Sequence, residues 1–76
     1  MPFCYNLITM ENLGQTIKEL RIERGLSQPK LAELVGVSKG MISIWENNVN
    51  EPKASYIKRL AVIFEVSADY ILGIEK

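Results

Sequence analysis

Two serines, Ser27 and Ser38, each precede a residue whose side chain can donate hydrogen bonds. A serine hydroxyl at a helix N-cap accepts a hydrogen bond from a free N–H of the first turn, so both serines predict a helix start. Gln28 would open the first helix, where free N–H groups and the helix dipole attract phosphate. Lys39 would open the second, and its ammonium can donate to O6 and N7 of guanine. The pattern therefore favours contacts to nucleic acid over catalytic chemistry.

Short apolar patterns on both sides of Gly36 predict the helices that hold these donors. The first helix spans about residues 28–35 and the second about 39–47, and Gly36 between them can adopt the left-handed conformation that ends a helix. Ile42 and Trp45 give the second helix an apolar edge at helical spacing. Two helices this short cannot lie antiparallel and bury much surface, so they must cross steeply and rest on a third element. Such a pair is a helix-turn-helix, whose second helix enters the major groove of DNA.

The flanking segments predict three further helices around the same core. Apolar residues at helical spacing place them at about 12–24, 54–64 and 68–72. Asn12, with Gln15 three residues later, has the pattern of a capping box at the start of the first of these helices. The expected fold class is therefore all-α, a compact domain of five helices.

Residues 1–11 precede this pattern and are expected to form an N-terminal arm ahead of a domain that spans residues 12–74. Pro2 comes early in the chain, and residues 1–9 show no helical period. Terminal segments are usually loose unless other contacts hold them, so the arm is interpreted as disordered or as lying upstream of the native start. The alternative is a functional arm that packs on a dimer partner or reaches DNA.

Both short helices and their flanks resemble one family, the lambda-repressor-like (Xre-type, Cro/C1-type) helix-turn-helix DNA-binding domains. The resemblance covers about residues 12–74, and it is specific because the flanking helices match in order and spacing as well as the helix-turn-helix itself. The matching residues are Ser27-Gln28, Leu31-Ala32, Gly36-Val37-Ser38, Ile42-Ser43, Trp45-Glu46, Pro52, Leu60-Ala61, Val66-Ser67 and Tyr70-Ile71-Leu72-Gly73.

The resemblance implies which residues would touch DNA. Gln28 would contact the phosphate backbone, and Asn47 at the end of the second helix would contact phosphate as well. The start of the second helix would face base edges in the major groove. The residues at these base-contacting positions are Ser38, Lys39, Gly40, Met41, Ser43 and Ile44.

Several of these residues could also serve another role, and two of them could contact DNA only in a particular way. Gln28 can be a solvated helix start, Lys39 can pair with phosphate, and Met41 can partly fill the core. Ile44 should point outward, where it can meet a thymine methyl group. Gly40 brings no side chain to a base, but it lets the backbone approach DNA closely.

Arg21 and Glu46 are expected to form an ion pair between the first helix of the domain and the second helix of the helix-turn-helix. Family members with arginine and glutamate at these positions tie the two helices together, and a guanidinium meets a carboxylate with two hydrogen bonds. The resemblance implies a partly buried, structural pair. The alternative is two solvated surface charges that add little stability.

The C-terminal segment is more apolar than one short helix needs. In the family that the chain resembles, this end often forms a two-fold dimer contact, so we expect a homodimer through Tyr70, Ile71, Leu72 and Ile74. A dimer would place two copies of the second helix in successive major grooves, about 34 Å apart, on a pseudo-palindromic operator.

Composition narrows the possible functions further. The chain has 76 residues, no histidine and a single cysteine, Cys4, so we expect neither an internal disulfide nor a metal site. No catalytic constellation, cofactor motif, membrane-spanning run or secretory signal is visible in the sequence. We therefore expect a cytoplasmic protein that is not an enzyme and that needs no cofactor, membrane or small-molecule ligand.

Net charge leaves more than one class of function open. Nine basic residues balance nine acidic ones, whereas a DNA-binding domain usually carries excess positive charge. We expect Lys30, Lys39 and Lys53 on the helix-turn-helix face, and we interpret the chain as a sequence-specific double-stranded DNA-binding transcription regulator, repressor-like and from a bacterium or phage. The alternatives are a protein-interaction module on the same scaffold, and an antitoxin or restriction-modification controller.

Overall fold

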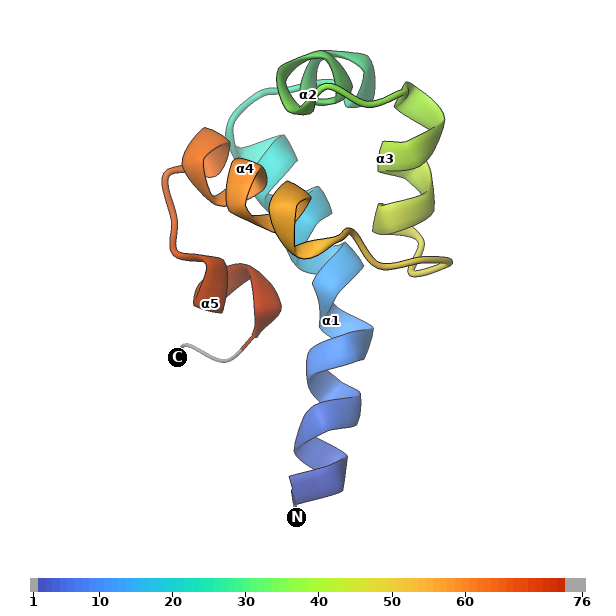
Figure 1. The fold of residues 1–76 in the computed structure, drawn as a ribbon, viewed down its shortest axis with the longest axis vertical. Helices are drawn as coiled ribbons and strands as arrows, with labels where there is room; N and C mark the ends of the chain where they lie inside the picture. Colours follow the sequence, from blue (N-terminus) through green and yellow to red (C-terminus); the bar gives the residue numbers. More distant parts are fainter. Residues whose placement is uncertain (1, 74–76) are drawn as a thin grey trace.

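The computed structural model describes the backbone of residues 2–73 and the side chains of residues 13–73. The helices are α1 (Pro2–Glu23), α2 (Gln28–Val35), α3 (Lys39–Glu46), α4 (Ala54–Phe64) and α5 (Ala68–Leu72), so the expected all-α fold of five helices is confirmed. α2 and α3 cross steeply at one end of the molecule (Figure 1), α5 packs on α1, and α4 packs on both α5 and α2. None of the described helices combines the length and the apolar character needed to span a membrane.

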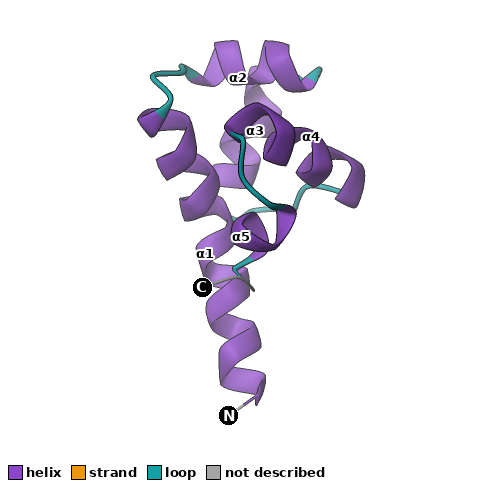
Figure 2. Ribbon diagram, turned by 90° about the vertical axis from the view of Figure 1, so that its left-hand side faces the viewer, coloured by secondary structure: helices purple, strands orange, loops and turns teal. Residues whose placement is uncertain are grey.

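α1 is longer than the sequence pattern predicts. It begins at Pro2 and not at about Asn12, because the stretch after Pro2 contains no helix breaker and a proline is tolerated in the first turn of a helix. Asn12 therefore lies inside the helix, and the capping-box prediction is wrong; Gln15 donates instead to the Glu19 carboxylate one turn later, at 3.1 Å. The N-terminal half of α1 projects away from the other helices in both views (Figures 1 and 2). That residues 1–11 act as a separate arm stays a prediction.

Twelve buried apolar side chains, among those described, hold the helices together. Trp45 of α3 is 2% exposed and lies obliquely on Tyr56 of α4, with ring centroids 5.4 Å apart. Trp45 is therefore a core residue that contacts α4, and a tilted ring pair adds to the stability gained by burial. The buried set is Leu13, Ile17, Leu20, Leu31, Ala32, Val35, Ile42, Trp45, Ile57, Leu60, Phe64 and Ile71.

Serine caps set the starts of three helices. The hydroxyl oxygens of Ser27, Ser38 and Ser67 each accept a hydrogen bond from the backbone N–H three residues later, at 3.1, 3.2 and 3.0 Å. Gly36 ends α2 in the left-handed conformation, with a φ of 91°, and its N–H donates to the Ala32 carbonyl oxygen at 2.8 Å. A side chain at that φ would be strained, so Gly36 fixes the turn that directs α3 away from α2.

Gly14 brings α1 into direct contact with the C-terminal end of α3. A Cβ atom at this position would lie 2.7 Å from the Glu46 carbonyl oxygen and closer still to that of Trp45, so the two helices can approach this closely only at a glycine. The Gly14 N–H donates to Oδ1 of Asn48 at 3.0 Å, and Asn48 has a left-handed φ of 60°. These contacts fix the C-terminal end of α3 on α1, whereas its first turn lies at the other end of the helix.

Candidate nucleic-acid interface

The first turn of α3 lies at the surface with little protein around it. Ser38, Lys39, Gly40 and Met41 are all exposed, and among the described side chains a Cβ atom at Gly40 would meet only that of Ser38, with Oγ at 3.9 Å. The fold itself therefore does not require a glycine at this position. The turn that was expected to contact base edges is open to another molecule.

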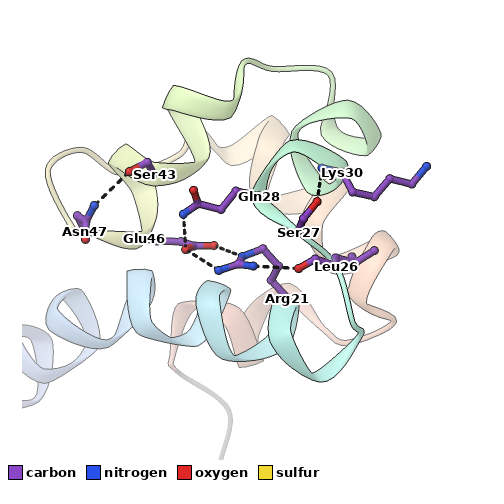
Figure 3. A network of polar contacts seen from close by, with 8 residues as sticks. All are labelled: Arg21, Leu26, Ser27, Gln28, Lys30, Ser43, Glu46 and Asn47. Carbon is purple, nitrogen blue, oxygen red and sulfur yellow. Dashed lines mark hydrogen bonds and ion pairs between the residues drawn. The ribbon is translucent and has the colours of Figure 1, made fainter.

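Gly40, Ser43 and Asn47 lie in one row along the outer side of α3. Their spacing of three and four residues puts them on the same side of an α-helix, whereas Ile42 and Trp45 on the opposite side are buried. Nδ2 of Asn47 donates to Ser43 Oγ at 3.2 Å (Figure 3). Within the described residues the Ser43 hydroxyl accepts this hydrogen bond and donates none, so its hydrogen is available to an acceptor such as a phosphate or a base edge.

Ile44 departs from its expected exposure. It is half-buried and packs against the core, although its spacing of four residues from Gly40 and three from Asn47 places it on the same side of α3 as Ser43. Ile44 is therefore less exposed than expected, and its contact with a thymine methyl group stays a prediction. Met41 is 37% exposed and remains available for an apolar contact with a thymine methyl group.

Arg21 of α1 and Glu46 of α3 form a nearly buried ion pair. Arg21 Nε lies 2.6 Å from Glu46 Oε2, and Arg21 Nη2 lies 3.2 Å from Oε1, which is the two-bond arrangement that the family resemblance implies (Figure 3). The two side chains are 12% and 3% exposed. Arg21 Nη1 also donates to the Leu26 carbonyl oxygen at 2.9 Å, so the same guanidinium holds the connection between α1 and α2.

Gln28, the first residue of α2, joins the same network. Its Nε2 donates to Glu46 Oε1 at 3.0 Å, and the residue is half-buried. Figure 3 shows the amide oxygen of Gln28 directed away from Glu46. The sequence carries no signal for this contact, because the two residues are 18 positions apart and meet only through the packing of α2 against α3.

Three lysines were expected on this face, and they differ in their surroundings. Lys30 Nζ lies 3.6 Å from Oε1 of Glu33 in the same helix, and Figure 3 shows Lys30 directed away from Gln28. Lys39 and Lys53 are exposed and form no ion pair within the described residues. Their ammonium groups are therefore the ones available to phosphate or to a base edge.

The C-terminal residues expected at a dimer contact do not all lie at the surface. Ile71 is fully buried in the core of the single chain, so its assignment to a dimer contact is wrong: its side chain is what holds α5 against the rest of the domain. Tyr70 is 46% exposed and Leu72 is half-buried, so both remain available to a partner. Ile74 lies outside the described residues.

Bacterial transcription regulators are similar to this chain in sequence. The HTH-type transcriptional regulator ImmR of Bacillus subtilis (strain 168) is 31% identical over 62 residues, which cover 82% of this chain and 49% of the regulator. SinR of the same organism is 34% identical over 61 residues, covering 79% and 55%. SutR of Escherichia coli (strain K12) is 41% identical over 56 residues, covering 68% and 32%. The chain thus spans about half the length, or less, of the curated relatives it matches.

The fold also matches a solved structure. The P22 c2 repressor protein, crystallised in complex with synthetic operator 9T in the presence of Tl+, superposes with a TM-score of 0.78 and 32% sequence identity, over 83% of this chain and 96% of that chain. The model of the helix-turn-helix family HTH_3 matches residues 17–71, which include all of α2, α3 and α4. These matches confirm the family that the sequence pattern indicates, and the chain belongs to the Xre-type helix-turn-helix family.

Proposed function

We propose that this protein is a sequence-specific regulator of transcription that binds double-stranded DNA and acts as a repressor. One observation carries the proposal: the outer row of α3, formed by Gly40, Ser43 and Asn47, lies at the surface beside the exposed Lys39. A helix presented in this way fits the major groove, which is about 12 Å wide. The P22 c2 repressor shares this fold and was crystallised with a synthetic operator, which supports operator binding by this chain.

In this proposal α2 and α3 contact DNA in different ways. Lys39 donates to guanine at a base edge, Ser43 donates its hydroxyl hydrogen, and Met41 meets a thymine methyl group. Gln28 at the start of α2 and Asn47 at the end of α3 contact phosphates. Phosphate contacts place α3 in the groove but carry no sequence information, so specificity would come from the first turn of α3.

A homodimer would double these contacts. Two copies of α3 would enter successive major grooves, about 34 Å apart, on a pseudo-palindromic operator. Tyr70 and Leu72 are the described residues of the C-terminal segment that remain available for the dimer contact. The protein would act in the cytoplasm of a bacterium or on phage DNA, without a cofactor or small-molecule ligand.

Selection of bound duplexes from a random DNA pool, at near-physiological salt, tests the proposal. We expect enrichment of a motif with two inverted half-sites about ten base pairs apart. The affinity for the selected duplex should fall steeply as the salt concentration rises, because the neutralisation of phosphates releases counterions.

Failure to enrich a motif would favour a different function. A net charge of zero is less typical of a DNA-binding domain than of a protein-interaction module on the same scaffold. Duplex binding that is weak and independent of sequence would contradict the proposal and direct the search to a protein partner.

A further inference from the structure

We infer that Glu46 is a positioning residue for DNA binding, because it holds the Gln28 amide in the orientation that presents an N–H to phosphate. The inference rests on the proposed function, in which Gln28 contacts the DNA backbone. In this inference the ion pair between Arg21 and Glu46 supports DNA binding as well as stabilising the fold.

Three donors converge on the Glu46 carboxylate. Oε2 accepts from Arg21 Nε at 2.6 Å, and Oε1 accepts from Arg21 Nη2 at 3.2 Å and from Gln28 Nε2 at 3.0 Å. An ionised carboxylate accepts hydrogen bonds and cannot donate them. Glu46 therefore binds the NH2 end of the Gln28 amide and disfavours the flipped orientation, in which the amide oxygen would face it.

The fixed amide retains one donor for a phosphate. Its NH2 group carries two hydrogens, one of which is used by Glu46, and the side chain of Gln28 forms no other hydrogen bond within the described residues. Phosphate oxygens also accept only, so a freely rotating amide would have to be ordered when DNA binds, which weakens binding. Glu46 imposes the orientation before DNA arrives.

Arg21 cancels the charge that would otherwise oppose this contact. A lone carboxylate close to the DNA backbone would repel phosphate. The guanidinium of Arg21 forms two bonds with Glu46, and the side chains are 12% and 3% exposed, so the pair is shielded from solvent and carries no net charge. Glu46 can therefore orient Gln28 without lowering the affinity for DNA.

A double-mutant cycle in DNA affinity separates this role from a purely structural one. The variants are Gln28→Ala, Glu46→Gln and the double variant, measured on the selected duplex under conditions where each is folded. We expect Gln28→Ala to weaken binding about tenfold, the effect of one hydrogen bond to a charged group. Glu46→Gln should weaken binding much more in the wild-type background than in the Gln28→Ala background. The charge left on Arg21 acts in both backgrounds, so the cycle removes its effect.

Gln15 and Glu19 of α1 provide the matched control, because their side chains form an exposed glutamine–glutamate hydrogen bond of 3.1 Å. The same cycle on this pair should show no coupling in DNA affinity. Equal effects of Glu46→Gln in both Gln28 backgrounds would overturn the inference and leave the proposed function intact. Absence of duplex binding by the wild-type chain would overturn the proposed function itself, and the inference with it.

A second measurement uses the wild-type chain alone and does not depend on the stability of the Glu46→Gln variant. The two Nε2 protons of Gln28 give separate NMR signals, which are followed as the selected duplex is added. We expect one signal to shift on binding and the other, from the proton held by Glu46, to stay near its free position. Movement of both signals, or of neither, would contradict the inference.

Discussion

The start of α2 and the first turn of α3 are both proposed to contact DNA, but the protein holds their side chains in opposite ways. Gln28 is bound to Glu46 at 3.0 Å and through it to Arg21, so its side chain belongs to a network that begins in α1. The side chains of Lys39 and Met41 form no hydrogen bond or ion pair within the described residues. The side chain at the start of α2 is held by the contacts that stabilise the fold, whereas the side chains in the first turn of α3 are not.

This difference matches the two kinds of contact that a DNA-binding protein makes. Phosphates repeat along DNA whatever its sequence, so a side chain that binds them can be fixed by the fold. Base edges differ from one operator to another, and the side chains that contact them must be replaceable without loss of the fold. We therefore expect changes around Glu46 to act on stability and changes in the first turn of α3 to act on specificity.

Among these variants, removal of Arg21 should lower the stability of the protein most, because Arg21 holds the Glu46 carboxylate to which Gln28 is bound. In Arg21→Ala the Glu46 carboxylate, which is 3% exposed, loses its partner charge, and a stranded buried charge lowers the free energy of unfolding by about 3 kcal/mol or more. Urea unfolding measures the change.

Lys30→Ala is the matched control for this loss, because Lys30 pairs with Glu33 at 3.6 Å on the surface of α2. Its effect on the free energy of unfolding should stay below about 0.5 kcal/mol. An Arg21→Ala variant that is as stable as Lys30→Ala would show that the pair has no structural role.

Gly14→Ala tests the other contact that holds α3 on α1. The added methyl group meets the carbonyl oxygens of Trp45 and Glu46. Overpacking costs about 1–3 kcal/mol, and the cost lies toward the upper end here because the clashing oxygens belong to the backbone. It therefore exceeds the gain in helix propensity of about 1 kcal/mol, and we expect a net loss of stability. Urea unfolding again gives the value, and a variant more stable than wild type would contradict the close approach of the two helices.

Lys39→Gln tests the exposed region, where we expect a change in specificity without a change in stability. The variant should lose discrimination at one base pair of the operator, an effect of about 1–3 kcal/mol, measured as affinities for a set of duplexes with single base-pair changes. Lys58→Gln on the exposed side of α4 should leave these affinities unchanged. A uniform loss of affinity for all duplexes would identify a phosphate contact instead. In that case the slope of log affinity against log salt concentration would also become shallower by about 0.9.

Gly40→Ala should give the smallest effect and the clearest contrast with Gly14→Ala. Outside its own helical turn, the added methyl group would meet one atom of the described residues, Ser38 Oγ at 3.9 Å, so helix propensity should raise the free energy of unfolding by up to about 1 kcal/mol. Affinity for the operator should fall, because the methyl group enters the space between α3 and DNA. Unchanged affinity would mean that the backbone of α3 does not approach DNA at this point.

The sequence predicts the fold best where a local rule decides the outcome. The serine caps, the turn at Gly36 and the buried side of α3 follow from N-cap chemistry and helical spacing, and the structure contains all of them. The start of α1 is different, because its first residues carry no regular apolar pattern and helix formation there follows only from the absence of a breaker. Ile44 lies two residues from the buried Ile42, a spacing that favours an outward orientation, but tertiary packing leaves it half-buried against the core.

The candidate site is less predictable than the fold, because part of it depends on helix packing. The exposed first turn of α3 follows from its position in the sequence and from the family resemblance. The contact between Gln28 and Glu46 and the close approach at Gly14 join residues 18 or more positions apart, and no local pattern marks them. Ile71 shows the same limit, since an apolar residue near a chain end can serve the core or a partner, and packing decides which.

An NMR titration of the labelled wild-type chain with its selected duplex tests the proposed DNA-binding surface most directly. We predict that the amide signals of residues 38–43, Gln28 and Asn47 shift. Those around Leu34 and Val62, exposed apolar residues beside a groove between α2 and α4, should stay in place. Shifts concentrated at Leu34 and Val62, or no shifts at all, would contradict the assignment of α3 and the start of α2 as the DNA-binding surface.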